Sequence, residues 1–72
     1  MTADEVHDKH GFIALLAQMR EELKFDSDGW QNIKLDDFLE AMSAWVNDWQ
    51  RPADTNPWTH AAKLIVAASM YE

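Results

Sequence analysis

The sequence predicts an all-α fold, a compact bundle of three amphipathic helices over residues 9–24, 35–50 and 57–71. Within each of these ranges, apolar residues recur at the three-to-four-residue spacing that places them on one helix face. The segments between the ranges are rich in aspartate, asparagine, glycine and proline, which favour turns. No stretch alternates apolar and polar residues as a strand does. We therefore expect one helical domain over residues 1–72.

The first predicted helix follows Asp8, a residue type that caps helix N-termini well. Its apolar residues fall within about 100° of one face. They are Phe12, Leu15, Leu16, Met19 and Leu23. The turn Asp26-Ser27-Asp28-Gly29 then leads to a linker that begins at Trp30.

The second predicted helix gives the clearest amphipathic pattern of the chain. Its apolar residues are Leu35, Phe38, Leu39, Met42, Trp45, Val46 and Trp49. Asp36, Asp37, Glu40 and Asp48 lie on the opposite side. Such an acidic face is either simply solvated or a docking surface for lysine and arginine side chains.

The third predicted helix is apolar over more than half of its circumference. Pro52 prevents the preceding helix from continuing, and Asn56 or Thr55 caps the new one, with Pro57 in its first turn. A helix with so wide an apolar arc is central, packs on two neighbours or faces a partner.

Thirteen acidic residues against six basic ones give a net charge of −7. Nucleic acid and anionic membranes are poor partners for such a surface, and a basic protein is a better one. The alternative is that the acidity only keeps a small domain soluble. The chain has no cysteine, no apolar run of the roughly 20 residues that span a bilayer, and an acidic N-terminus unlike a signal peptide, so we expect a cytoplasmic protein.

Neither catalysis nor a bound cofactor is expected from the residues. The serines have no histidine at a matching spacing, and the only glycines are Gly11 and Gly29, too few for a phosphate loop. His7, Asp8 and His10 lie close together but lack a further metal ligand. The segment Asp26–Gly29 resembles the start of a calcium loop without its later ligands.

Four tryptophans are many for 72 residues. We expect Trp30, Trp45 and Trp58 to form a small aromatic core around Phe38 and Leu39. Trp49 lies at a helix end and is predicted at the rim of a binding surface, where tryptophan is a favoured hot-spot residue.

Three polar residues have expected structural roles. Asn32 is predicted to bond backbone groups where the second helix begins. Asp48 is expected to accept a hydrogen bond from an indole or a loop amide. His60 is expected on the polar side of the third helix, in contact with solvent.

The stretch Trp30–Asp48 resembles an uncharacterised family of small, mostly bacterial proteins with the pattern W-x-N-x-x-L-x-x-F-L-E-A-M-x-A-W-x-x-D. That family also tends to carry a proline-tryptophan pair before a last helix that finishes in tyrosine-glutamate, here Pro57-Trp58 and Tyr71-Glu72. The short loop between the second and third helices departs from the family pattern. The resemblance implies a small helical domain and supplies no reaction.

These observations favour a protein-binding module of the inhibitor or immunity type, with a basic partner. The residues expected to bind it are Asp36, Asp37, Glu40, Asp48 and Trp49. Burial contributes on the order of 100 kcal/mol for such a chain, and ordering it costs about the same, so an added interface would matter. The alternative is therefore a structural homo-oligomer, such as a homodimer, that uses the third helix.

Overall fold

The computed structural model describes residues 2–26 and 28–71, and it confirms the all-α prediction. A short 3-10 helix, η1 (Ala3–Glu5), precedes α1 (Lys9–Phe25), α2 (Leu35–Asp48) and α3 (Pro57–Met70). The predicted helix ends differ from these bounds by at most two residues. The largest difference is at the end of α2, where Trp49 already has an extended backbone with ψ of 114°.

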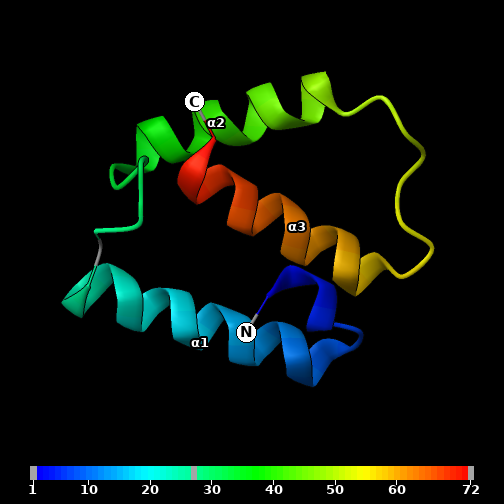
Figure 1. The fold of residues 1–72 in the computed structure, drawn as a ribbon, viewed down its shortest axis with the longest axis horizontal. Helices are drawn as coiled ribbons and strands as arrows, with labels where there is room; N and C mark the ends of the chain where they lie inside the picture. Colours follow the sequence, from blue (N-terminus) through cyan, green and yellow to red (C-terminus); the bar gives the residue numbers. More distant parts are fainter. Residues whose placement is uncertain (1, 27, 72) are drawn as a thin grey trace.

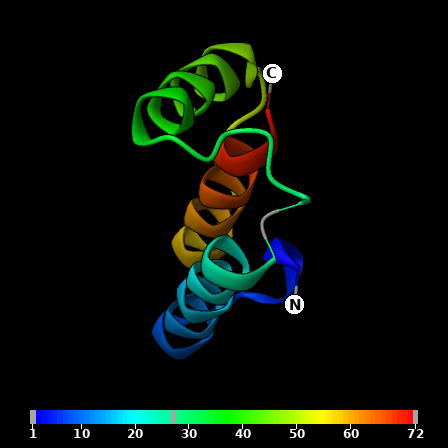
Figure 2. The ribbon, with the colours of Figure 1, turned by 90° about the vertical axis from the view of Figure 1, so that its left-hand side faces the viewer.

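The helix α3 lies in the middle of a single layer, between α1 and α2 (Figure 1). It runs antiparallel to α2 and in the same general direction as α1. The Cα atoms extend over 32 × 27 × 15 Å, and the view turned by 90° shows the layer from its edge (Figure 2). Because α1 and α2 pack on α3 rather than on each other, α3 needs the wide apolar arc that its sequence shows.

Side-chain caps begin α1 and α3 at the predicted residues. The Asp8 carboxylate accepts the backbone N–H of Gly11 at 2.8 Å. The Asn56 side-chain oxygen accepts the backbone N–H groups of Trp58 and Thr59 at 2.9 and 3.3 Å. These contacts satisfy N–H groups that have no partner within the helix.

The hydrophobic core lies between the N-terminal segment, α1 and α3. Val6 and Ala62 are completely buried, and Leu15 and Met19 nearly so. The segment that precedes α1 is therefore part of the core, although its sequence had pointed only to its acidic residues and His7.

Two polar contacts hold the same segment against the start of α3. The Thr59 hydroxyl donates to the Val6 carbonyl, and the Asn56 amide donates to the His7 carbonyl at 2.8 Å. Thr59 is itself buried, so its hydroxyl needs this acceptor.

The expectation of one aromatic core is wrong, because the tryptophans pack in three separate places. Trp30 does stack on Phe38, with ring centroids 6.3 Å apart. Trp45 instead packs on Trp49 at 4.8 Å, and Trp58 packs on Phe12 at 5.8 Å. Leu39, predicted near the centre of that core, is 53% exposed. Because α3 lies between α1 and α2, the Trp58–Phe12 pair on the α1 side cannot share a core with the two aromatic pairs on the α2 side.

Candidate functional site

The four acidic residues predicted to bind a partner all lie on α2 and are exposed: Asp36, Asp37, Glu40 and Asp48. Asp36 and Asp37 lie in the first turn, where the helix dipole favours negative charge. The structure brings two of the four, Asp37 and Glu40, to the wall of one cavity. It gives Asp48 a separate contact, and Asp36 does not line this cavity.

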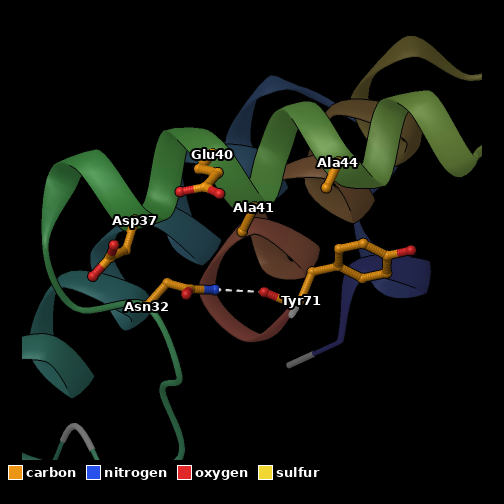
Figure 3. Close-up of a pocket in the computed structure, with 6 residues that line it drawn as sticks. All are labelled: Asn32, Asp37, Glu40, Ala41, Ala44 and Tyr71. Carbon is orange, nitrogen blue, oxygen red and sulfur yellow. Dashed lines mark hydrogen bonds between the residues drawn. The ribbon is translucent and has the colours of Figure 1, made fainter.

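That cavity has a volume of about 190 Å³ and lies between α2, the preceding linker and the end of α3. Ala41 and Ala44 of α2 face the ring of Tyr71 across it, and the small alanine side chains leave the space open (Figure 3). Asp37 and Glu40 extend from α2 at the end of the cavity near Asn32 (Figure 3). The cavity can therefore offer two carboxylates beside an aromatic wall.

Asn32 fixes the linker to the C-terminal end of α3. Its side-chain amide donates to the carbonyls of Ala68 at 3.1 Å and Tyr71 at 2.8 Å. The backbone N–H groups of Gln31 and Asn32 both donate to the Ser69 carbonyl, at 2.9 and 3.0 Å. These donors satisfy carbonyls that a helix end leaves free. The predicted role of Asn32 at the start of α2 is thus corrected, because the side chain caps α3 instead.

Asp48 accepts a hydrogen bond from the Tyr71 hydroxyl, and not from an indole or a loop amide as predicted. This hydrogen bond raises the pKa of Tyr71 above its ordinary value of 10.0, with further contributions from desolvation and from the Asp48 charge. Asn32 and Asp48 therefore join α2 and its linker to the last residues of the chain.

Trp49 is half-buried in a cluster at the C-terminal end of α2. Its ring packs on Trp45 and lies edge-to-face with His60, with ring centroids 5.4 Å apart. The Arg51 guanidinium lies 4.4 Å from the centroid of the Trp49 ring, over its face. Its indole N–H is buried, and no residue that the structure describes accepts it. Asp36 lies about 20 Å away along the helix, so Trp49 and the first-turn acids do not form one compact site.

His60 belongs to this cluster and is half-buried, whereas the sequence analysis placed it in solvent. Its Nδ1 lies 3.3 Å from a carboxylate oxygen of Asp54, which also pairs with Lys63 Nζ at 3.2 Å. The hydrogen bond from Lys63 holds the pKa of Asp54 below its ordinary value of 3.8, with a smaller contribution from His60, although partial desolvation acts against it. The group fastens the loop that follows α2 to α3.

Large apolar side chains remain exposed on all three helices and on the linker between α1 and α2. Among residues 2–26 and 28–71, ten are exposed: Ile13, Leu16, Leu23, Phe25, Ile33, Leu35, Leu39, Val46, Trp58 and Met70. On α2, the exposed residues Leu35, Leu39 and Val46 lie within about 40° of one another and form an apolar stripe along the helix. The one residue that α2 buries is Ala41, so α2 meets α3 through a small side chain and leaves this stripe uncovered.

Two further hollows meet at Trp30. One has a volume of about 280 Å³ and is lined only by apolar side chains: Leu23, Trp30, Ile33, Leu35 and Phe38. The other has a volume of about 260 Å³, and its polar lining residues are Glu22, Asp26 and Ser69. Gly29, Trp30 and apolar residues of α1 and α3 complete its lining. Trp30 is a wall of both.

Residues 2–26 and 28–71 contain no group of three or more histidine, aspartate or glutamate side chains placed to hold a metal ion. The calcium-like segment includes Ser27, which lies outside the described residues. In the same part of the chain, no helix is long and apolar enough to cross a membrane.

The family of the chain follows from its sequence. A family of unknown function (DUF7660) matches residues 8–72. The chain belongs to this family. No curated protein matches the chain, and no solved structure matches it either.

In this member of the DUF7660 family, the motif residues meet where α2 joins the end of α3. Trp30 stacks on Phe38, Asn32 bonds the last carbonyls of α3, and Asp48 bonds Tyr71. These are structural contacts within the chain. They show that residues of the central motif attach α2 and its linker to α3. Apart from Asp48, the exposed apolar and acidic side chains of α2 take no part in these contacts.

Sequence reasoning missed the hollows at Trp30, because it treated residues 26–34 as a turn and a connection. A signal was present, since Trp30 and Ile33 are large apolar residues in a short linker that follows a polar turn. Turn residues of this kind are usually polar.

Proposed function

We propose that this member of the DUF7660 family is a small acidic protein-binding module of the inhibitor or immunity type, which recognises a basic partner protein and catalyses no reaction. In this proposal it acts in the cytoplasm and without a cofactor. The single observation that carries the proposal is the juxtaposition, on α2, of an uncovered apolar stripe and a row of unpaired carboxylates.

The surface area of the molecule supports a binding role. Its solvent-accessible surface is 5178 Å². Area scaling gives roughly 4,600 Å² for a folded monomer of this mass, so the excess is about 600 Å². One side of a standard protein interface covers about 800 Å². A flat layer with this much accessible surface, on which large apolar side chains are exposed, gains stability when a partner covers part of it.

The charges on α2 support a basic partner. Among the described residues, the ion pairs join Lys63 to Asp4 and Asp54, and His60 to Asp54. Asp36, Asp37 and Glu40 thus have no internal cation beside them in that part of the chain. Unpaired carboxylates on one face accelerate encounter with a positively charged protein and orient it.

The test is a pull-down of the purified chain with the products of genes adjacent to its own. We expect one basic neighbour to bind, and the variant Asp36→Lys with Glu40→Lys to weaken that binding by about a hundredfold at low salt. The control variant Glu5→Lys with Glu21→Lys changes the net charge equally but leaves α2 intact. If both variants weaken binding equally, the acidic face of α2 has no specific role.

The alternative, a homo-oligomer through α3, is less favoured by the arrangement of the helices, because α1 and α2 cover α3 from two sides. Sedimentation velocity at high micromolar concentration separates the two functions. A monomer that binds a basic neighbour supports the module, and a stable dimer that binds none supports the oligomer.

A further inference from the structure

We infer that the two hollows that meet at Trp30 form one docking groove for a partner segment in which an apolar side chain is flanked by lysine or arginine. This inference rests on the proposed function and names the surface and the partner chemistry for it. The groove is defined by Leu23, Trp30, Ile33, Leu35 and Phe38 in its apolar half, and by Glu22 and Asp26 in its acidic half.

The apolar half has the size and lining of a side-chain pocket. Its volume of about 280 Å³ exceeds that of a large aliphatic side chain, and every residue that lines it is apolar. Leu35 is 72% exposed and Ile33 is 56% exposed, so the walls lose contact with water only when another surface covers them. Covering such side chains removes apolar area from water, which favours binding.

The acidic half defines the charge of the occupant. Glu22 is half-buried, and both Glu22 and Asp26 line the second hollow beside Trp30. Neither carboxylate is in an ion pair within the described part of the chain. A lysine or arginine next to the apolar side chain of a partner can reach this hollow across Trp30, whose ring is also a good surface for a cation.

The same charges disfavour a second copy of this chain as the occupant. Residues 20–40, which include the seven residues that define the groove, carry seven acidic and three basic residues, a net charge of −4. Two copies joined at their grooves would bring these charges together, and each chain carries −7 in total. Like charges facing each other across an interface repel and weaken association. A cationic, apolar segment removes that repulsion.

The walls of the groove are held in place before binding. Trp30 stacks on Phe38, and the next two residues donate their backbone N–H groups to Ser69 of α3. A fixed tryptophan between two hollows loses little conformational freedom when a partner binds. Trp30 is thus the expected hot spot of the interface.

The test uses the full chain labelled with nitrogen-15 and three synthetic peptides of equal length with the same helical spacing. One carries leucines with lysines, the second leucines with glutamates, and the third serines with lysines. We expect only the leucine–lysine peptide to shift the amide resonances of residues 22–38. Equal shifts with the serine–lysine peptide would contradict the role of the apolar half of the groove. Equal shifts with the leucine–glutamate peptide would contradict the role of its acidic half.

Variants of exposed residues locate the binding without loss of the fold. Ile33→Ser with Leu35→Ser is expected to weaken binding of the leucine–lysine peptide by about tenfold. The control, Ile13→Ser, removes an exposed aliphatic side chain of α1 that lies outside both the groove and the α2 stripe, and we expect a change below about twofold. Equal losses in both variants would contradict the groove as the binding surface.

Binding of the basic neighbour by the same variants separates this inference from the proposed function. If the α2 charge reversals abolish binding of the basic neighbour but the Ile33 and Leu35 variant does not, the module stands and the groove is wrong. If the groove variant abolishes it and the charge reversals do not, the groove stands and the acidic face of α2 has no role. If the chain forms a dimer that the groove variant dissociates, the occupant is a second copy and the inference fails.

Discussion

The two sides of α3 are held by different kinds of contact. On the side of α1 and the N-terminal segment, large side chains are buried: Val6, Leu15 and Met19. On the side of α2, the buried side chain of that helix is an alanine, Ala41. The α2 side is held by hydrogen bonds of Asn32 and Asp48 and by the half-buried aromatic cluster around Trp49.

This difference shows how each side is attached and which apolar side chains it leaves exposed. The α1 side buries Val6, Leu15 and Met19 against α3, while Ile13, Leu16, Leu23 and Phe25 stay exposed on α1. The α2 side fixes the helix with polar contacts and leaves Leu35, Leu39 and Val46 exposed. A helix attached in this way is positioned without consuming its apolar face, which suits a binding surface.

The largest effect is expected from the core on the α1 side. Leu15 is 2% exposed, so Leu15→Ala should lower the free energy of unfolding by about 2–5 kcal/mol through lost burial and a cavity. Leu39→Ala, the same change at a 53% exposed position of α2, should cost less than about 1 kcal/mol. Urea unfolding followed by circular dichroism measures both. Equal costs would show that both sides of α3 are held by apolar burial.

A smaller effect is expected from Asn32→Ala, which removes the donors to the Ala68 and Tyr71 carbonyls. We expect a loss of about 1–3 kcal/mol, because partly buried carbonyls then lack a partner. Hydrogen exchange should accelerate in α2 and the end of α3 and much less in α1. Asn47→Ala, at an exposed position of α2, is the control. An exchange increase spread evenly over α1 would argue against separate attachment of the two sides.

On the α1 side, Thr59→Val tests a polar contact within a mainly apolar interface. The variant keeps the branched shape but removes the hydroxyl that donates to Val6, so we expect a loss of about 1 kcal/mol. Thr55→Val in the exposed loop is the control. A cost as large as that of Leu15→Ala would mean that a hydrogen bond, rather than burial, dominates this side.

The smallest effect concerns pH on the α2 side. The pKa of Tyr71 is raised in the folded state, so the protonated hydroxyl is stabilised by folding. That contribution is complete below the unfolded pKa of about 10 and disappears as pH rises through the higher folded value. The melting temperature of the wild type should therefore fall more steeply above about pH 10 than that of Tyr71→Phe. Identical alkaline profiles would mean that the hydrogen bond to Asp48 has little weight.

Helix positions were predictable from the sequence, because periodicity and the capping residues Asp8 and Asn56 act within a few residues of chain. The arrangement was predictable only in part: the wide apolar arc of α3 indicated a central helix. The burial of Val6 was not predictable, since a three-residue helical turn has no periodicity and its fixing contacts come from Thr59 and Asn56, about 50 residues away along the chain.

The candidate site was less predictable than the fold. The exposed acids of α2 followed from the helical pattern, because one helix face decides their position. The partners of Asn32, Asp48 and His60 could not be found in this way, since they depend on which ends of α2 and α3 meet. The exposure of the α2 stripe could not be predicted either, because apolar periodicity shows which face of a helix is apolar and not whether a neighbour covers that face.

The central place of α3 has a consequence for how the chain is made. Of the three helices, α3 is synthesised last, and until then α1 and α2 have nothing to pack on. Isolated helices of about 14 to 17 residues are marginal in water. At about 5–20 residues per second, the nascent chain spends a second or more with both apolar faces unpaired. Packing of α1 and α2 on α3, and with it binding to a partner, begins only once α3 has left the ribosome.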